Sequence, residues 1–426
     1  MRRRHLLWTL AAGAGAALWL RPDPHGAPHD AYFDALDRLL RAEGPGRPVL
    51  LIDLDRLERN CARLRDSVAP GKALRIVAKS LPSIGLLRHV LARTASTRVM
   101  AFHQPFLNAL AAALPATDIL LGTPLPLAAA ATFYRELAPG APFDPARSPQ
   151  WLIDTPERLA QYQGLARTLG TRMRINLELD VGLHRGGLDD PHALDALLAT
   201  IAADPAHLEF AGFMGYDAHI GRVPAVLESP ARTLARAQST YRAFVERARA
   251  SAGATALTLN GAGSPTYRLH GPDSPLTEVA VGSALLKPAD FDLDLLADFE
   301  PAAFIATPVL KVIDGLQLPG PDWAGRAGAA WDPNRRRSFF IYGGKWMARC
   351  VSPAGLADNA LYGSSSNQAL LNASAAVDLA VDDHVFLRPT QSEAVLLQFG
   401  ELLAVRAGRI EARWPVLPAV DAGVGG

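Results

Sequence analysis

The chain has 426 residues, of which 49% are hydrophobic, and its 43 basic and 42 acidic side chains leave a formal net charge of +1. This balance excludes a polybasic nucleic-acid-binding protein and a disordered acidic chain, and the presence of only two cysteines excludes a small disulfide-stabilised fold. Five of the basic residues are lysines and the others are arginines. A lysine amine can lose its proton and act as a nucleophile, which a guanidinium cannot, so every lysine is a candidate catalytic group.

The N-terminus has the pattern of an export signal. Three arginines are followed by a largely apolar run of 15 residues from Leu6, which is short for a membrane span of ~20 residues. Residues 3–7 also resemble a twin-arginine signal. We therefore expect residues 1–25 to form an export signal or a membrane anchor, which predicts a periplasmic or inner-membrane-anchored protein. A buried N-terminal helix is the alternative. Residues 26–47 read as a linker with one amphipathic helix at 31–42.

Short apolar runs then alternate with helical patterns. Eight strands are predicted at 74–78, 99–102, 118–121, 151–154, 174–179, 210–216, 257–260 and 278–281. Helices are predicted between most of them, at 83–93, 105–113, 126–137, 156–169, 191–203 and 230–252. Eight regular units favour a closed (β/α)8 TIM barrel, placed at 70–299, over an open doubly wound sheet.

After residue 299 the pattern changes to short strands separated by Gly and Pro turns, which predicts a mostly β C-terminal domain at 300–426. Its strands are expected at 306–313, 338–342, 384–387, 394–398 and 402–406. An earlier strand, at 49–53, lies in a segment (48–69) that joins the two domains. We expect this strand to pair with the first barrel unit that it precedes.

Polar residues at the C-terminal ends of barrel strands form the active-site rim in this fold. Lys79 follows the first predicted strand, and its stem leaves an apolar run. Partial desolvation of its amine would suit Schiff-base formation, whereas the alternative is a rim lysine in solvent. Other rim residues are His103 after the second strand, Arg185 in a glycine-rich turn after the fifth, and Tyr216, Asp217 and His219 after the sixth.

The last two strands are followed by residues suited to an anion. Glycines allow backbone N–H groups to approach a ligand and hydroxyls add donors, and barrel phosphate sites commonly use these two loops. The residues are Gly261, Gly263, Ser264, Gly282 and Ser283. Asp217 and His219 are two residues apart, so they could form a metal pair, an acid/base pair or an ordinary hydrogen-bonded pair.

In order and spacing, these motifs resemble the fold-type III pyridoxal-phosphate enzymes, and within them the D-threonine aldolase and D-serine dehydratase-like branch of the alanine racemase superfamily. The likeness runs from Pro48 to about Val405. It is carried by the segments 48–55, 78–79, 180–187, 215–219, 260–264 and 277–283.

This resemblance implies pyridoxal 5'-phosphate (PLP) as the cofactor, bound covalently by Lys79. It further implies that His103, Arg185 and Tyr216 contact the cofactor, and that the two glycine- and serine-containing loops hold its phosphate. We expect Lys79 and His219 to be catalytic, with a base near His219, or a metal-bound hydroxyl, taking the proton of the substrate β-hydroxyl. The resemblance also implies a homodimer that acts on a small D-amino acid, and nucleic acid is not expected as a partner.

One motif departs from the family pattern. The branch usually carries His-x-Cys or His-x-Asp after a proline, and these residues hold a divalent metal. Here the segment after Pro389 places Gln391 and Glu393 at those positions. An amide and a carboxylate would favour Mg or Mn over zinc, or hold no metal.

The leading functional hypothesis is therefore a PLP-dependent lyase that cleaves a D-β-hydroxy amino acid to glycine and an aldehyde, as D-threonine aldolases do. The alternatives are a D-serine dehydratase, an amino acid racemase and a non-catalytic PLP carrier.

Overall fold

The structure is a computed structural model that describes residues 21–418, except 225, 253–255, 317–321 and 364. The chain divides into two compact units. The β unit comprises residues 21–51, Ala303–Thr390 and Val405–Glu411, and the barrel unit comprises Ile52–Ala302, Gln391–Ala404 and residues 412–418. Gln391–Ala404 therefore belongs with the barrel, although the sequence suggested a β domain that continues to the C-terminus.

The barrel unit is built on eight parallel strands that close into a barrel, which confirms the predicted TIM-barrel fold. Closure is made by the first and last strands, where Arg75 lies opposite Ala280. Each strand begins and ends within two residues of its predicted bounds. The strands are β2 (Ala73–Val77), β3 (Arg98–Ala101), β4 (Asp118–Leu121), β5 (Pro149–Ile153), β6 (Met173–Glu178), β7 (Leu208–Gly215), β8 (Thr258–Gly261) and β9 (Glu278–Val281).

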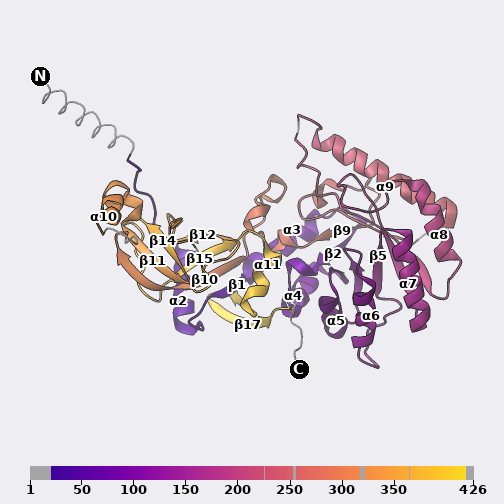
Figure 1. Cartoon of the computed structure of the whole chain (residues 1–426), viewed down its shortest axis with the longest axis horizontal. Helices are drawn as coiled ribbons and strands as arrows, with labels where there is room; N and C mark the ends of the chain where they lie inside the picture. Colours follow the sequence, from indigo (N-terminus) through magenta and orange to yellow (C-terminus); the bar gives the residue numbers. More distant parts are fainter. Residues whose placement is uncertain (1–20, 225, 253–255, 317–321, 364, 419–426) are drawn as a thin grey trace, which may run out of the picture. The chain divides into compact units, whose positions relative to one another are not determined.

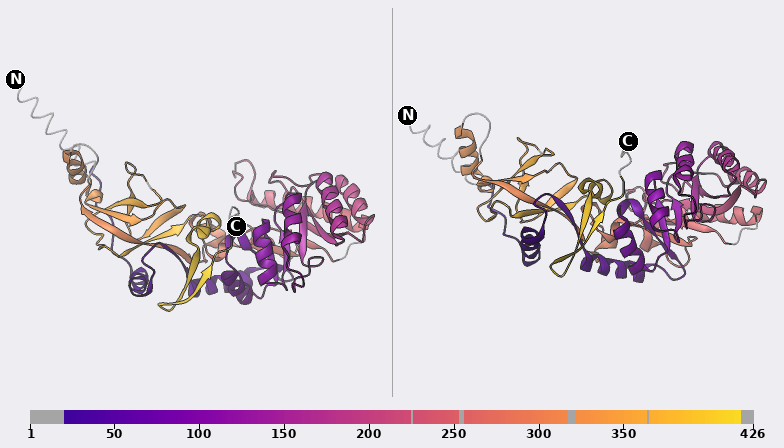
Figure 2. Two further views of the ribbon diagram at one scale, coloured as in Figure 1. Left: turned by 60° about the horizontal axis from the view of Figure 1, so that its bottom comes forward. Right: turned by 90° about the horizontal axis from the view of Figure 1, so that it is seen from below.

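Helices surround these strands (Figures 1 and 2). They are α3 (Leu54–Ser67), α4 (Ile84–Thr94), α5 (Gln104–Ala113), α6 (Leu127–Glu136), α7 (Pro156–Leu169), α8 (Leu194–Ala202) and α9 (Pro230–Ala252). Local sequence explains their ends, as α7 illustrates. The Thr155 side chain accepts a hydrogen bond from the Arg158 N–H, Pro156 takes the first helical position, and Gly170 ends the helix with a φ of 61°.

The interior of the barrel contains a buried charged network. The Arg75 guanidinium is fully buried and donates to Glu278 Oε2 over 2.9 Å and to Asp118 Oδ1 over 2.7 Å. Burial alone would raise the pKa of Glu278, but Arg75 and Arg98 hold that pKa below its ordinary value. The network therefore keeps both carboxylates ionised, and it joins strands β2, β4 and β9.

The β unit contains most of a nine-stranded sheet with the order β13-β14-β11-β10-β1-β16-β17, in which β15 pairs with β10 and β12. The early strand β1 lies between β10 and β16 in this sheet, so the expected pairing with the first barrel unit was wrong. The strands of the sheet are β1 (Val49–Asp53), β10 (Ala303–Asp314), β11 (Arg337–Tyr342), β12 (Ala348–Ser352), β13 (Ala357–Asp358), β14 (Gln368–Ala373), β15 (His384–Pro389), β16 (Glu401–Arg406) and β17 (Arg409–Pro415). Two helices, α2 (Ala31–Glu43) and α10 (Asp322–Trp331), also belong to this unit. The sequence did not predict β12, β13, β14 or β17.

The prediction of a strand at 394–398 was wrong. The chain there forms helix α11 (Ser392–Leu396), followed by a 3-10 turn at Leu397–Phe399. The buried residues from 392 to 399 are Ser392, Val395, Leu396 and Phe399. This spacing places them on one side of a helix rather than on alternate faces of a strand.

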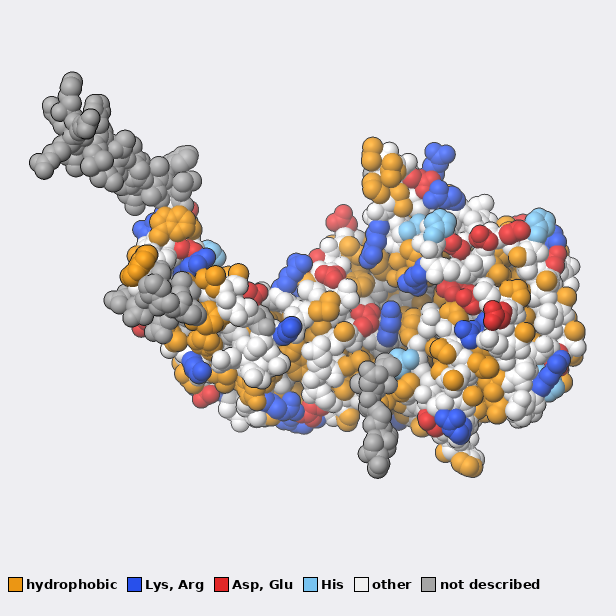
Figure 3. Space-filling model, in the orientation of Figure 1, with side chains coloured by type: hydrophobic (Ala, Val, Ile, Leu, Met, Phe, Trp, Pro, Cys, Tyr) orange, Lys and Arg blue, Asp and Glu red, His pale blue; other side chains and the backbone are white. Residues whose placement is uncertain are grey.

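The N-terminal segment predicted to direct export lies outside the described residues, except for 21–25. In the part of the chain that the structure describes, no helix is both long and apolar enough to cross a membrane. Figure 3 shows basic and acidic side chains interspersed over the visible face of the barrel unit, in keeping with the net charge of +1.

We predict that Arg75→Met lowers the free energy of unfolding by about 3–5 kcal/mol, because it leaves the buried Glu278 carboxylate without its main partner. Arg172→Met is the matched control. Arg172 pairs with Glu209 on the surface of the same unit, and its side chain is 48% exposed, so the control should cost at most about 1 kcal/mol. Urea denaturation followed by circular dichroism measures both changes. Equal losses in the two variants would contradict the role assigned to Arg75.

Candidate functional site

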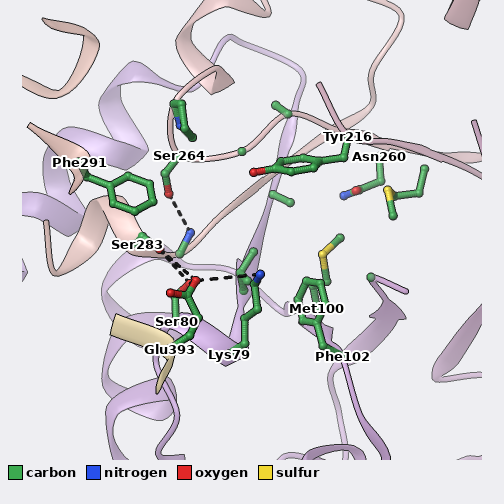
Figure 4. A pocket seen from close by; sticks show the side chains of 18 of the residues that line it. Lys79, Ser80, Met100, Phe102, Tyr216, Asn260, Ser264, Ser283, Phe291 and Glu393 are labelled. Carbon is green, nitrogen blue, oxygen red and sulfur yellow. Dashed lines mark hydrogen bonds and ion pairs between the residues drawn. The ribbon is translucent and has the colours of Figure 1, made fainter. Parts of the chain in front are cut away.

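A cavity of about 150 Å³ lies at the C-terminal ends of the barrel strands (Figure 4). Most of the residues that line it come from the strand ends and from the loops that follow them, and one comes from α11. They include Val77, Lys79, Ser80, Met100, Phe102, Arg185, Tyr216, Asn260, Gly263, Ser264, Gly282, Ser283, Phe291 and Glu393. The cavity therefore lies on the face of the barrel where the sequence analysis placed the active site.

Lys79 points into this cavity from a 3-10 turn, Ala78–Ser80, that directly follows β2. Its Nζ lies 4.0 Å from Glu393 Oε1 and 4.5 Å from the centre of the Phe102 ring. The side chain is 44% exposed, so the amine is more open than the expected desolvation implied. A carboxylate and the face of an aromatic ring both attract its positive charge.

The loops after β8 and β9 meet beside Lys79. The hydroxyl oxygen of Ser264 accepts hydrogen bonds from the Ala284 N–H over 3.0 Å and from the Gly282 N–H over 3.4 Å. A Cβ at position 282 would lie 2.8 Å from the Cβ atoms of both Ser80 and Val77, so only glycine fits there. The three hydroxyls of Ser80, Ser264 and Ser283 thereby line one side of the cavity.

Tyr216 and Arg185 form another wall. The Arg185 guanidinium carbon lies 5.1 Å from the centre of the Tyr216 ring, which is the geometry of a cation–π contact. Gly263 makes room for this ring, since a Cβ there would lie 2.7 Å from Tyr216 Cε2. Burial, with a contribution from Asp217, raises the pKa of the Tyr216 phenol, so its hydroxyl stays a hydrogen-bond donor at neutral pH.

Glu393 enters the site from α11. The Ser80 hydroxyl donates to its Oε1 over 3.0 Å, and the Ser283 hydroxyl lies 3.5 Å from the same oxygen (Figure 4). The carboxylate therefore faces Lys79 and the two hydroxyls together.

The structure does not bring His219, His103 or Gly261 into the lining of this cavity. The His219 ring is buried next to Gly182, where a Cβ would lie 3.0 Å from its Nε2, and burial lowers its pKa. His103 packs against Phe106, with ring centres 3.9 Å apart. At Gly261, the last residue of β8, a Cβ would meet Leu276. The roles expected of these three residues therefore stay predictions from the sequence.

Asp217 and His219 also do not form the pair considered from their spacing. Strand β7 ends at Gly215, so the alternation of a strand does not reach these residues. Asp217 instead accepts hydrogen bonds from the Thr266 hydroxyl and pairs with His270 Nε2, both over 2.6 Å. Thr266 in turn accepts from the Gly263 N–H over 3.1 Å, so Asp217 supports the loop after β8.

The residues proposed for a metal do not converge on one point. The Gln391 amide donates to Asp290 over 3.3 Å, whereas Glu393 accepts from Ser80 and faces Lys79. Among the described residues, no group of three or more His, Cys, Asp or Glu side chains is placed to hold a metal ion. The donors present here therefore do not fit the divalent-metal site that the resemblance implied.

Several lining residues were not singled out from the sequence. Ser80 directly follows the candidate lysine, and Phe102 is the last residue of a predicted strand, so their positions carried a usable signal. Phe291 lies in a 3-10 turn after the last barrel strand, and nothing in its sequence context indicates a role. Glu178, at the end of β6, is a further titratable group on this face. Burial and the neighbouring charge of Asp154 raise the pKa of Glu178 to about 7, although Arg185 opposes this rise.

The comparisons with known proteins agree with this architecture. Residues 52–289, more than half of the chain, match the family described as alanine racemase, N-terminal domain, and the protein therefore belongs to that family. No curated protein matches the chain.

Solved structures resemble it over most of its length. The D-threonine aldolase from Filomicrobium marinum has a TM-score of 0.69 and 19% identity, and the match covers 87% of this chain and 97% of that one. The D-threo-3-hydroxyaspartate dehydratase from Delftia sp. HT23 has a TM-score of 0.63 and 20% identity, with the same coverage. The alanine racemase from Bacillus anthracis has a TM-score of 0.66 and 13% identity, again with 87% and 97% covered. At these identities the likeness is one of fold.

We predict that Glu178→Gln stabilises the protein at pH 8 but not at pH 4.5. The pKa of Glu178 is raised from its ordinary 4.5 to about 7, so the folded protein favours the protonated side chain. The contribution of Glu178 to the free energy of unfolding is therefore fully present below pH 4.5 and is lost as the pH rises to 7. The gain at pH 8 should be about 1 kcal/mol after allowance for solvent screening. Thermal unfolding at both pH values measures it, with the exposed Glu157→Gln as control. A gain of equal size at the two pH values would contradict the assignment.

Proposed function

We propose that this protein is a PLP-dependent lyase that cleaves a D-β-hydroxy amino acid to glycine and an aldehyde. The observation that carries the proposal is the position of Lys79. It lies in the 3-10 turn that follows the first barrel strand and faces the loops after the last two strands, within an alanine racemase-type barrel. The structural likeness to a D-threonine aldolase and a D-threo-3-hydroxyaspartate dehydratase supports the class of substrate.

The residues of the cavity fit PLP. The Lys79 amine would bind the aldehyde of the cofactor, and the hydroxyls of Ser264 and Ser283 with nearby backbone N–H groups would hold its phosphate. Tyr216 and Arg185 supply an aromatic face and a positive charge beside the place where the ring would lie. When bound, PLP supplies an electron sink for the electron pair released at the substrate α-carbon.

The side chains of this site would bind and orient the substrate. The substrate amine would take the position of the Lys79 amine, which is then free to carry a proton near the α-carbon. Arg185 is placed to attract an anionic group. The aromatic rings of Phe102, Tyr216 and Phe291 cover the cavity walls and reduce the access of water.

A dehydratase is the second candidate, because a hydroxyaspartate dehydratase resembles the chain with 20% identity and a TM-score of 0.63. Loss of the α-proton followed by loss of the β-hydroxyl would give this outcome from the same residues. A racemase, which the likeness to alanine racemase suggests, needs proton carriers on both faces of the α-carbon. A non-catalytic PLP carrier is less well supported, because carriers resemble the bare barrel and this chain adds a β unit.

We also propose, from the sequence, that the protein acts in the periplasm or at the inner membrane, and that it works as a homodimer. The arginines before the apolar N-terminal run support the location. The homodimer is an inference from the family resemblance.

We predict that purified protein incubated with PLP shows the visible absorption band of a lysine-bound cofactor, and that Lys79→Ala abolishes it. Lys311→Ala is the control, since Lys311 belongs to the β unit and its amine lies 5.3 Å from the centre of the Phe340 ring. Absorption spectra of the three proteins make the test. A band that persists in Lys79→Ala would disprove the assignment of the cofactor lysine.

We predict that the PLP-loaded enzyme releases glycine and acetaldehyde from D-threonine and leaves the L-enantiomer unchanged. Coupled assays on D-threonine, D-serine and D-alanine separate the alternatives, because pyruvate from D-serine indicates a dehydratase and L-alanine from D-alanine indicates a racemase. Failure to turn over any of the three would favour the carrier.

A further inference from the structure

Glu393 lies where two cavities of the barrel unit meet. The cavity described above and a larger one of about 690 Å³ share Lys79, Pro265, Phe291 and Glu393 in their linings. The larger cavity extends toward Arg222 and Asp294. A carboxylate at this position therefore borders both the place that suits the cofactor and the larger space that a substrate can occupy.

The contacts of Glu393 orient its carboxylate. Its side chain is 29% exposed, and its Oε1 lies 4.0 Å from Lys79 Nζ. The same oxygen accepts the hydrogen bond from Ser80 and lies 3.5 Å from the Ser283 hydroxyl. Within the described residues, the hydrogen bonds and ion pair of Glu393 all involve Oε1. The second oxygen, Oε2, is thus left to accept a proton from a ligand.

A metal ligand at this position would need partners that the chain does not place there. Gln391 has an amide rather than an imidazole, and this amide is hydrogen-bonded to Asp290. The other polar neighbours of Glu393 are an amine and two hydroxyls, which donate to a carboxylate. Such donors suit an ionised carboxylate that exchanges protons with a ligand. They suit a carboxylate that shares a cation with Gln391 less well.

We propose that Glu393 is a catalytic residue that transfers the proton of the substrate β-hydroxyl to the α-carbon, and that this transfer uses no metal ion. The inference rests on the proposed function. It assigns to a carboxylate of this chain the proton transfer that the resemblance had assigned to a metal-bound hydroxyl or to a base near His219.

The step balances without a further reactant. Glu393 accepts the β-hydroxyl proton, the O–H electron pair becomes the second bond of the aldehyde carbonyl, and the Cα–Cβ bond breaks. The electron pair of that bond stays with the α-carbon fragment, for which bound PLP would supply the electron sink. Glu393 then returns the proton to the α-carbon, directly or through Lys79. Glycine and an aldehyde leave, and the carboxylate is again ionised.

Three variants of the full-length, PLP-loaded protein test this proposal. Glu393→Gln keeps the shape and the Ser80 contact but cannot accept the proton, so kcat on D-threonine should fall by about 10²–10⁴-fold, while the affinity for PLP stays the same. Glu393→Asp retains the carboxylate on a shorter side chain and should keep part of the activity. Gln391→Ala is the matched control from the same segment. Metal content by atomic emission, PLP affinity by fluorescence titration and kcat with and without a chelator are measured for each.

The proposal expects wild-type protein without stoichiometric metal, activity that survives the chelator, and a loss of kcat confined to position 393. A bound metal that both Glu393→Gln and Gln391→Ala remove, together with inactivation by chelator, would overturn it in favour of a ligand role. Full kcat in Glu393→Gln would also overturn it. If Glu393→Gln does not bind PLP, kcat of Glu393→Asp is compared with kcat of Gln391→Ala. Only a loss confined to Glu393→Asp then agrees with the proposal. A wild-type protein that binds no PLP or cleaves no D-threonine would instead refute the proposed function itself.

Discussion

The buried ion pair between Arg75 and Glu278 is the constraint on which the site depends. The two residues lie on β2 and β9, the strands that close the barrel, and both side chains are fully buried. Breaking such a pair is costly, because either partner alone would be an uncompensated charge in the interior. Lys79 comes four residues after Arg75, and Gly282 four residues after Glu278. The pair therefore sets the register between the strand that precedes Lys79 and the strand that precedes the loop proposed to hold the cofactor phosphate.

The same network extends to other strands that line the cavity. Asn260 of β8 donates to Glu278 Oε1 over 2.8 Å, so the start of the Asn260–Ser264 loop is tied to the ion pair. Asp217 supports that loop through Thr266. These hydrogen bonds fix the positions of residues that line the cavity. A site fixed in this way can orient a cofactor and a substrate with little reorganisation.

Sequence reasoning predicted the parts of the molecule that depend on local order. The apolar periodicity and the Pro and Gly positions around α7 located strands and helices, and the position of Lys79 after β2 identified the candidate nucleophile. The sequence was less informative where the position of a residue depends on the path of a loop or on a segment distant in the chain. His219 follows the end of β7, and its burial next to Gly182 is decided by tertiary packing. Glu393 arrives from a segment more than 100 residues after Ser283, and the short apolar run beside it has no period that distinguishes a helix from a strand.

The central claim is that Lys79 is the residue that binds PLP. The most direct measurement is reduction of the PLP-loaded protein with borohydride, which makes the bond between lysine and cofactor permanent, followed by peptide mass spectrometry. The account predicts a pyridoxyl group on the peptide that contains Lys79 and on no other lysine peptide. A pyridoxyl group on Lys72, Lys287, Lys311 or Lys345 in place of Lys79, or no modification in protein that has been incubated with PLP, would contradict it.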